Sequence, residues 1–183
     1  MSVRLFRAVP TRIAAVGAVW LAKFVVARAL ASGSDAFVTT LDPGPWQGLG
    51  ERLDGSGALT VAPPAHPRPH APATPDRPVL IVDDLDPAAG SVAMPWRSQL
   101  TLLRQLTPAG VSVLKSADLV LVQRLTAAEA ALAGSAFKLT DQSSQLLQEL
   151  EPDMLALIGG GADRYIWLDP TSAERREIGV VRP

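Results

Sequence analysis

Short apolar runs, separated by polar and by glycine- or proline-rich stretches, dominate the hydrophobic pattern of the chain. Ile13–Val16, Val79–Val82 and Leu119–Val122 are apolar throughout, which is typical of strands buried on both faces of a parallel sheet. Weak alternation, or β-branched and aromatic content, predicts further strands. These lie at Ala36–Leu41, Ala58–Val61, Ser98–Leu106 and Tyr165–Leu168.

Helical spacing appears between several of these runs. Apolar positions from Ala18 to Leu30 recur loosely at helical intervals, and Gly33 is placed to end that helix. Two capping boxes, each a threonine followed three residues later by a glutamate, predict helices beginning after Thr126 and Thr171. A short helix is also expected at Trp46–Leu53.

A longer helix is predicted after Asp141, which would cap it, with Gly159–Gly161 at its end. Pro152 would either kink this helix or begin a second one. Its core face would consist of Leu146, Leu147, Leu150, Met154, Leu155 and Ile158.

The alternation of strands and helices predicts an α/β fold with a mostly parallel, possibly mixed, sheet covered by helices on both faces. Residues 12–42 have the strand–helix–strand layout of a parallel βαβ unit. We expect one domain at 13–179, preceded by a basic arm at 1–12. It would be interrupted by a proline-rich loop at 62–78, because Pro63–Pro78 holds seven of the 16 prolines.

Composition narrows the functional classes. The 183 residues are 48% hydrophobic and carry a formal net charge of −1, which argues against a nucleic-acid binder. The absence of cysteine excludes disulfides, thiolate nucleophiles and cysteine-ligated zinc. The longest apolar run, Ile13–Ala22, ends at Lys23 and is too short to span a bilayer. No clean signal-peptide cleavage site follows it, so we expect a soluble, unsecreted chain.

Nucleotide-binding motifs are incomplete. Gly17 follows a strand as a dinucleotide-binding turn would, but bulky residues fill the other glycine positions of that fingerprint. The run Leu80–Asp84 resembles a Walker B strand, whereas none of the three lysines follows a glycine as a Walker A motif requires. Nucleotide hydrolysis is therefore not expected.

Metal and catalytic candidates are few. Asp83, Asp84 and Asp86 are weak candidates for a divalent-cation site at the carboxyl end of the sheet, and the alternative is that they cap a loop or pair with arginines. His66 and His70 have the spacing of a helical metal pair, but the prolines between them forbid the helix. We predict no catalytic residue, no metal and no cofactor.

Two further features have alternative interpretations. Gly159–Gly161 could cradle a phosphate, but it follows a predicted helix, so a helix C-cap is favoured. Trp46, Trp96 and Trp167 could mark a partner surface, and core packing is at least as well supported.

The order of several segments resembles EccE, a component of actinobacterial type VII (ESX) secretion systems. The similar segments are Ala14–Ala22, Arg28–Gly33, a strand ending near Trp46, Ala117–Gln123, Glu129–Gly134, Asp153–Ile158, Tyr165–Leu168, Pro170–Thr171 and Glu174 with Ile178–Gly179. Together they cover most of 12–179.

This resemblance implies a cytosolic domain on the inner-membrane complex, with EccB, EccC and EccD as partners and no catalytic residues. In that family two membrane-spanning helices precede the domain. The chain lacks them, so it would either start just after them, with 1–12 as a juxtamembrane arm, or be a stand-alone soluble relative. The alternative hypothesis is a ligand- or nucleotide-sugar-binding α/β domain with a transferase-like fold, which the βαβ start and Asp83–Asp84 motivate.

Overall fold

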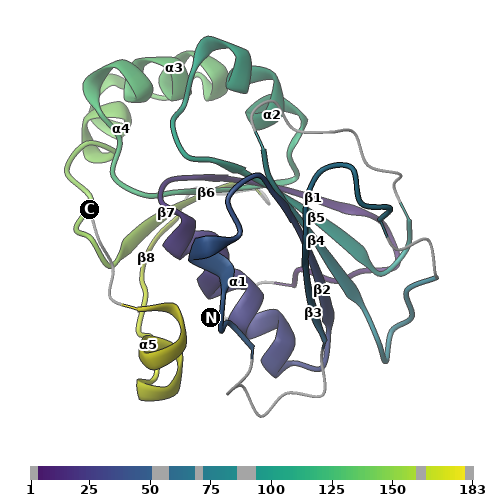
Figure 1. Cartoon of the computed structure of the whole chain (residues 1–183). Coiled ribbons are helices and arrows are strands. Elements are labelled where there is room, and N and C mark those ends of the chain that lie inside the picture. The colour runs from purple at the N-terminus through teal and green to yellow at the C-terminus, as the bar shows by residue number, and fades with distance from the viewer. Residues whose placement is uncertain (1–3, 51–57, 69–71, 86–93, 160–163, 180–183) are drawn as a thin grey trace.

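A computed structural model describes residues 4–50, 58–68, 72–85, 94–159 and 164–179. Within these residues, eight strands form a single sheet, in the order β3-β2-β4-β5-β1-β6-β7-β8 (Figure 1). The strands are β1 (Thr11–Val16), β2 (Asp35–Thr40), β3 (Leu59–Ala62), β4 (Val79–Asp84), β5 (Arg97–Leu103), β6 (Leu119–Val122), β7 (Met154–Gly159) and β8 (Arg164–Trp167).

The sheet is mostly parallel, as the apolar runs predict. Every neighbouring pair from β3 to β6 is parallel, whereas β7 runs antiparallel to both β6 and β8. The first strand, β1, lies at the centre, where Ile13 is in register with Leu100 on one side and Leu119 on the other. The two strands of the predicted βαβ unit share the sheet, but β4 and β5 lie between them.

Helices cover both faces, which confirms the predicted α/β class (Figure 1). The helices of one face are α1 (Val19–Ala31) and α5 (Ser172–Ile178), and those of the other are α2 (Val111–Ser116), α3 (Ala127–Phe137) and α4 (Asp141–Leu146). Because strand side chains alternate between faces, each face has its own core. Trp20, Leu21 and Val82 belong to the α1 side, and Val16 and Val122 belong to the α2–α4 side.

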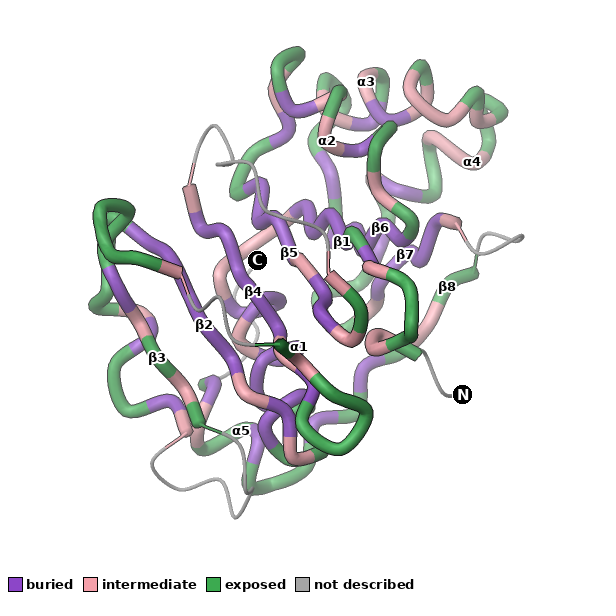
Figure 2. The backbone as a smooth tube through the Cα atoms, turned by 90° about the vertical axis from the view of Figure 1, so that its right-hand side faces the viewer, coloured by how far each residue is buried: buried purple, intermediate pink, exposed green. Residues whose placement is uncertain are grey.

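Burial follows these layers. The central strands are buried along most of their length, while β8 at one edge is largely exposed (Figure 2). No helix in the described part of the chain is both long enough and apolar enough to cross a bilayer.

The predicted helix after Asp141 is wrong in its second half. Helix α4 ends at Leu146, and Met154–Gly159 is strand β7. The leucine spacing fits a helix, but the run from Met154 to Ile158 is continuously apolar and is buried on both faces between β6 and β8. The N-cap is Thr140, whose hydroxyl accepts from the Ser143 N–H, and not Asp141.

Two smaller predictions also differ. The chain makes a short 3-10 turn at Gly44–Trp46 and further turns up to Gly50, so no helix begins at Trp46, and residues 51–53 lie outside the described part. Gly159 ends a strand and not a helix, with φ +112°. A Cβ there would lie 2.8 Å from the Asp118 carbonyl oxygen. Gly160 and Gly161 lie outside the described residues.

Candidate functional site

The carboxyl ends of the parallel strands meet along one edge of the sheet, which is where α/β folds usually bind ligands. Gly17 follows β1, Asp84 ends β4, Arg104 follows β5 and Gln123 follows β6. Sequence analysis identified Gly17 and Asp84 but gave no signal for Arg104 or Gln123, because only the sheet order brings them to this edge.

The turn between β1 and α1 is closed by a side chain. Gly17 has φ +147° and donates its N–H to the Leu103 carbonyl at 3.0 Å. The next N–H, that of Ala18, is 2.8 Å from Oε1 of Gln123, which is 8% exposed. The N–H groups at a helix N-terminus are those that would meet a bound anion. In this chain the Gln123 carboxamide oxygen lies where an anion would contact the Ala18 N–H, the first of these groups.

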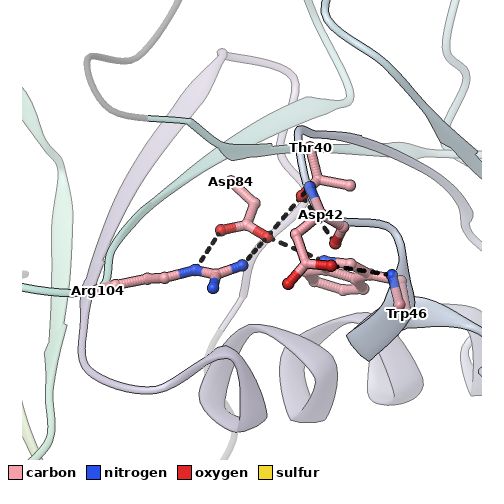
Figure 3. Close-up of polar contacts among 6 residues, drawn as sticks. Thr40, Asp42, Trp46, Asp84 and Arg104 are labelled. Carbon is pink, nitrogen blue, oxygen red and sulfur yellow. Dashed lines mark hydrogen bonds and ion pairs between the residues drawn. The ribbon is translucent and has the colours of Figure 1, made fainter.

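Asp84 is surrounded by donors from three segments (Figure 3). Its Oδ1 accepts from Arg104 Nε at 2.9 Å. Its Oδ2 accepts from Arg104 Nη2 at 2.8 Å, from the Thr40 hydroxyl at 2.9 Å and from Trp46 Nε1 at 3.0 Å. The Asp84 side chain is only 2% exposed. Hydrogen bonding to Asp84 holds the pKa of the Arg104 guanidinium above its ordinary value, and the nearby Asp42 charge acts in the same direction.

Asp83 points to the opposite face of the sheet, because it is the neighbour of Asp84 in the same strand. Its carboxylate is ion-paired with the Arg68 guanidinium and accepts from Gln99 Nε2 at 2.7 Å. Burial raises the pKa of the Asp83 carboxyl, although the hydrogen bond from Gln99 and the charge of Arg68 oppose this rise.

The structure therefore separates the predicted metal candidates. Asp83 and Asp84 face opposite sides of the sheet and pair with different arginines, which is the alternative that the sequence left open. Asp86 lies outside the described residues. Among the residues that the structure describes, no group of three or more histidine, aspartate or glutamate side chains is placed to hold a metal ion.

The remaining sequence candidates are dispersed. His66 stacks against Phe37 with ring centroids 6.1 Å apart, while His70 lies outside the described residues. Trp46 is buried and Trp96 is half-buried, but Trp167 on β8 is 63% exposed. Trp167 borders an apolar pocket of about 550 Å³ between α1 and the sheet, whose lining includes Phe24, Leu121 and Leu157.

Comparisons with known proteins show a similarity of fold and nothing further. A scan against models of protein families found no match, and neither did a search of curated proteins. Among solved structures, the genome packaging NTPase B204 from Sulfolobus turreted icosahedral virus 2, in complex with ATP-γS, is similar at a TM-score of 0.54. The match has 10% sequence identity and covers 88% of this chain and 97% of that chain. At this identity the two proteins share a fold.

Proposed function

We propose that this chain is a non-enzymatic assembly domain of the type VII secretion membrane complex, with EccB, EccC and EccD as its partners. The resemblance to EccE suggests membership of the type VII secretion complex. The arrangement of side chains at the carboxyl edge of the sheet supports the absence of catalysis. The observation that carries the second part is that Asp84 already accepts four hydrogen bonds within the chain. Three of the four donors lie on Oδ2, and the Arg104 guanidinium spans both oxygens, so the charge of this carboxylate is already neutralised within the chain, which disfavours a cation or an attacking water at it.

The turn after β1 supports the same conclusion. A phosphate at the N-terminus of α1 would have to displace the buried Gln123 side chain from the Ala18 N–H. Only two residues, Gly17 and Ala18, lie between the end of β1 and the start of α1 at Val19. A glycine-rich loop long enough to wrap around phosphates is therefore missing between them.

A nucleotide-binding function is the second candidate, because one specific observation favours it. The structurally similar viral protein is an NTPase in complex with ATP-γS, and Asp84 ends a strand at the edge where a nucleotide would bind. Thermal unfolding with millimolar ATP-γS and Mg²⁺ separates the two functions. We expect no shift in Tm. A ligand at 100 times its Kd would add about 2.7 kcal/mol, so a rise of several degrees that Asp84→Asn abolishes would establish nucleotide binding.

The assembly role is tested in an actinobacterium that carries the type VII system. Replacing the segment 13–179 by a flexible linker should abolish co-purification of the protein with the other membrane components, and should impair secretion. The control is the double variant Asp84→Asn with Arg104→Gln, which keeps a hydrogen-bonded pair at the strand end. It should assemble and secrete normally. Normal assembly without the segment would refute the structural role, and failure of a folded control would point to chemistry at Asp84.

A further inference from the structure

The sheet face opposite α1 has a polar patch next to its apolar core. Four polar side chains of β2, β4 and β5 point to this face: Thr39, Asp83, Gln99 and Thr101. In the register of the sheet, Asp83 lies between Thr39 on β2 and Thr101 on β5. Asp83 is completely buried, and Thr39 is 1% exposed. A buried carboxylate in such a place is stable only when it is neutralised or paired.

The cation that pairs with Asp83 comes from outside the sheet. It is Arg68, carried by the segment 63–68, which we call the strap and which follows β3. Two contacts hold the strap to this face: His66 stacks on Phe37, and both terminal nitrogens of Arg68 donate to the two oxygens of Asp83. The strap contains three prolines and is assigned to no helix or strand, so it adds little regular structure of its own.

The groups on the sheet have the pattern that recognises a guanidinium group. A carboxylate with both oxygens presented side by side accepts the two parallel N–H donors of an arginine fork. The Gln99 carboxamide donates to Asp83 at 2.7 Å and fixes the orientation of that carboxylate. The neighbouring Thr39 hydroxyl is buried without a hydrogen-bond partner in the described part of the chain, so one polar group of the patch remains unsatisfied.

We propose that Asp83 and Gln99 form an arginine-binding site that the strap occupies in cis, and that an arginine in an extended segment of a partner protein occupies it in trans. The occupant is an arginine-containing peptide, because the site already holds that side chain on a proline-rich backbone. The strap thereby acts as a tethered competitor that closes the face until a partner replaces it. This proposal goes beyond the assembly role and does not depend on which machine the chain belongs to.

The test uses the whole chain with Arg68→Ala and a blocked peptide, His-Pro-Arg-Pro, that copies the sequence of residues 66–69. We expect the variant to bind this peptide, measured by calorimetry, about tenfold or more tightly than the wild type, since Arg68 leaves only a small fraction of wild-type sites open. The same peptide with citrulline, a neutral analogue of arginine, should not bind. Adding Asp83→Asn to Arg68→Ala should abolish binding.

Arg77→Ala is the matched control, because Arg77 lies in the same proline-rich loop but pairs with Asp35 on the surface. It should bind the peptide no better than the wild type. If Arg68→Ala alone fails to fold, the arginine peptide, but not the citrulline peptide, should restore folding when it is present during refolding. Equal binding by Arg68→Ala and wild type, equal binding of the two peptides, indifference to Asp83→Asn, or no recovery of folding would each overturn the proposal.

Discussion

Gln123 is a single side chain that alters the chemistry of a whole edge of the sheet. Its Oε1 accepts the Ala18 N–H, and its own N–H donates to the Val16 carbonyl at 3.0 Å. It therefore ties β6 to the turn after β1 while satisfying one of the free donors at the start of α1. The turn is therefore closed by groups of the chain itself.

Gly17→Ala tests how tightly this turn is packed. A Cβ at Gly17 would overlap the Gln123 carboxamide and lie 3.0 Å from the Gln123 Cβ, and φ is +147°. We expect a loss of about 2 kcal/mol in the free energy of unfolding, from overpacking and backbone strain together. Urea denaturation measures it.

Gly48→Ala is the matched control, since Gly48 also has positive φ, at +74°, but nothing lies within 4 Å of its Cβ position. It should cost about 1 kcal/mol, from backbone strain alone. Adding Gln123→Ala to Gly17→Ala should recover part of the larger loss. Equal losses at the two glycines would mean that the Gln123 contact does not constrain the turn.

At the scale of elements, two helices depend on capping boxes that are visible in the sequence. Thr126 and Glu129 begin α3, and Thr171 and Glu174 begin α5, with both reciprocal hydrogen bonds formed in each case. Glu129 also accepts from the Leu106 N–H at 2.9 Å, and Glu174 accepts from Arg28 Nε at 2.8 Å. Each glutamate thus connects a helix start to another part of the fold.

These two glutamates make stability depend on pH. Burial acts to raise the pKa of each carboxyl, but the hydrogen bonds that Leu106 and Arg28 donate, with those from the caps, more than offset it, so both pKa values lie below the ordinary value. A carboxyl with a lowered folded-state pKa stabilises the fold above its unfolded value and loses this contribution as the pH falls through its folded value. Wild-type stability should therefore fall from about pH 4.5 downwards.

Glu129→Gln and Glu174→Gln should each make the loss of stability below about pH 4.5 smaller. Thr126→Ala and Thr171→Ala should each lower the free energy of unfolding by about 1 kcal/mol at neutral pH. Urea denaturation between pH 3 and 7 measures both effects. Glu149→Gln serves as the control, because Glu149 is an exposed carboxylate hydrogen-bonded to Gln145 within the same local segment. If neither Glu129→Gln nor Glu174→Gln changed the loss of stability at acid pH, the assignment would be contradicted.

Local sequence signals predict elements well where the local preference and the fold agree. The apolar runs of β1, β4 and β6 and both capping boxes are correct because their causes lie within a few residues. The prediction for Met154–Gly159 fails because leucine spacing alone cannot distinguish a buried strand from a helix. The segment forms a strand because it pairs with β6, which is distant in the sequence.

The candidate site shows the same limit. The sequence places two carboxylates at a strand end and includes arginine pairing among its alternatives. It cannot tell that Arg104 and Arg68 take one carboxylate each, on opposite faces, because those pairs depend on the sheet order and on the path of the proline-rich loop. The residue that closes the α1 turn, Gln123, carries no local motif.

For the whole molecule, the two cores share strands β1, β5, β6 and β7. Ile13 and Ala15 of β1 belong to the α1 side, and Ala14 and Val16 belong to the α2–α4 side. Loss of either core would leave the same strands uncovered, so the layers should unfold together.

Equilibrium denaturation checks this coupling. The change in tryptophan fluorescence reports chiefly the α1 side, where Trp20 and Trp46 are buried, since Trp96 is half-buried and Trp167 is exposed. Far-ultraviolet circular dichroism reports all helices, including α2–α4. We expect the two denaturation curves to coincide. Thr126→Ala, which weakens the far side only, should shift both curves equally. Separate midpoints for the two probes would show that the faces unfold independently.

The position of β1 has a consequence for synthesis on the ribosome. Of the strands described above, β1 is synthesised first, and both of its neighbours begin much later, β5 at residue 97 and β6 at residue 119. At about 5–20 residues per second, the nascent chain holds β1, whose last four residues are all apolar, without a partner for several seconds. Chaperone engagement with this strand should therefore begin when β1 emerges and end once β6 has emerged.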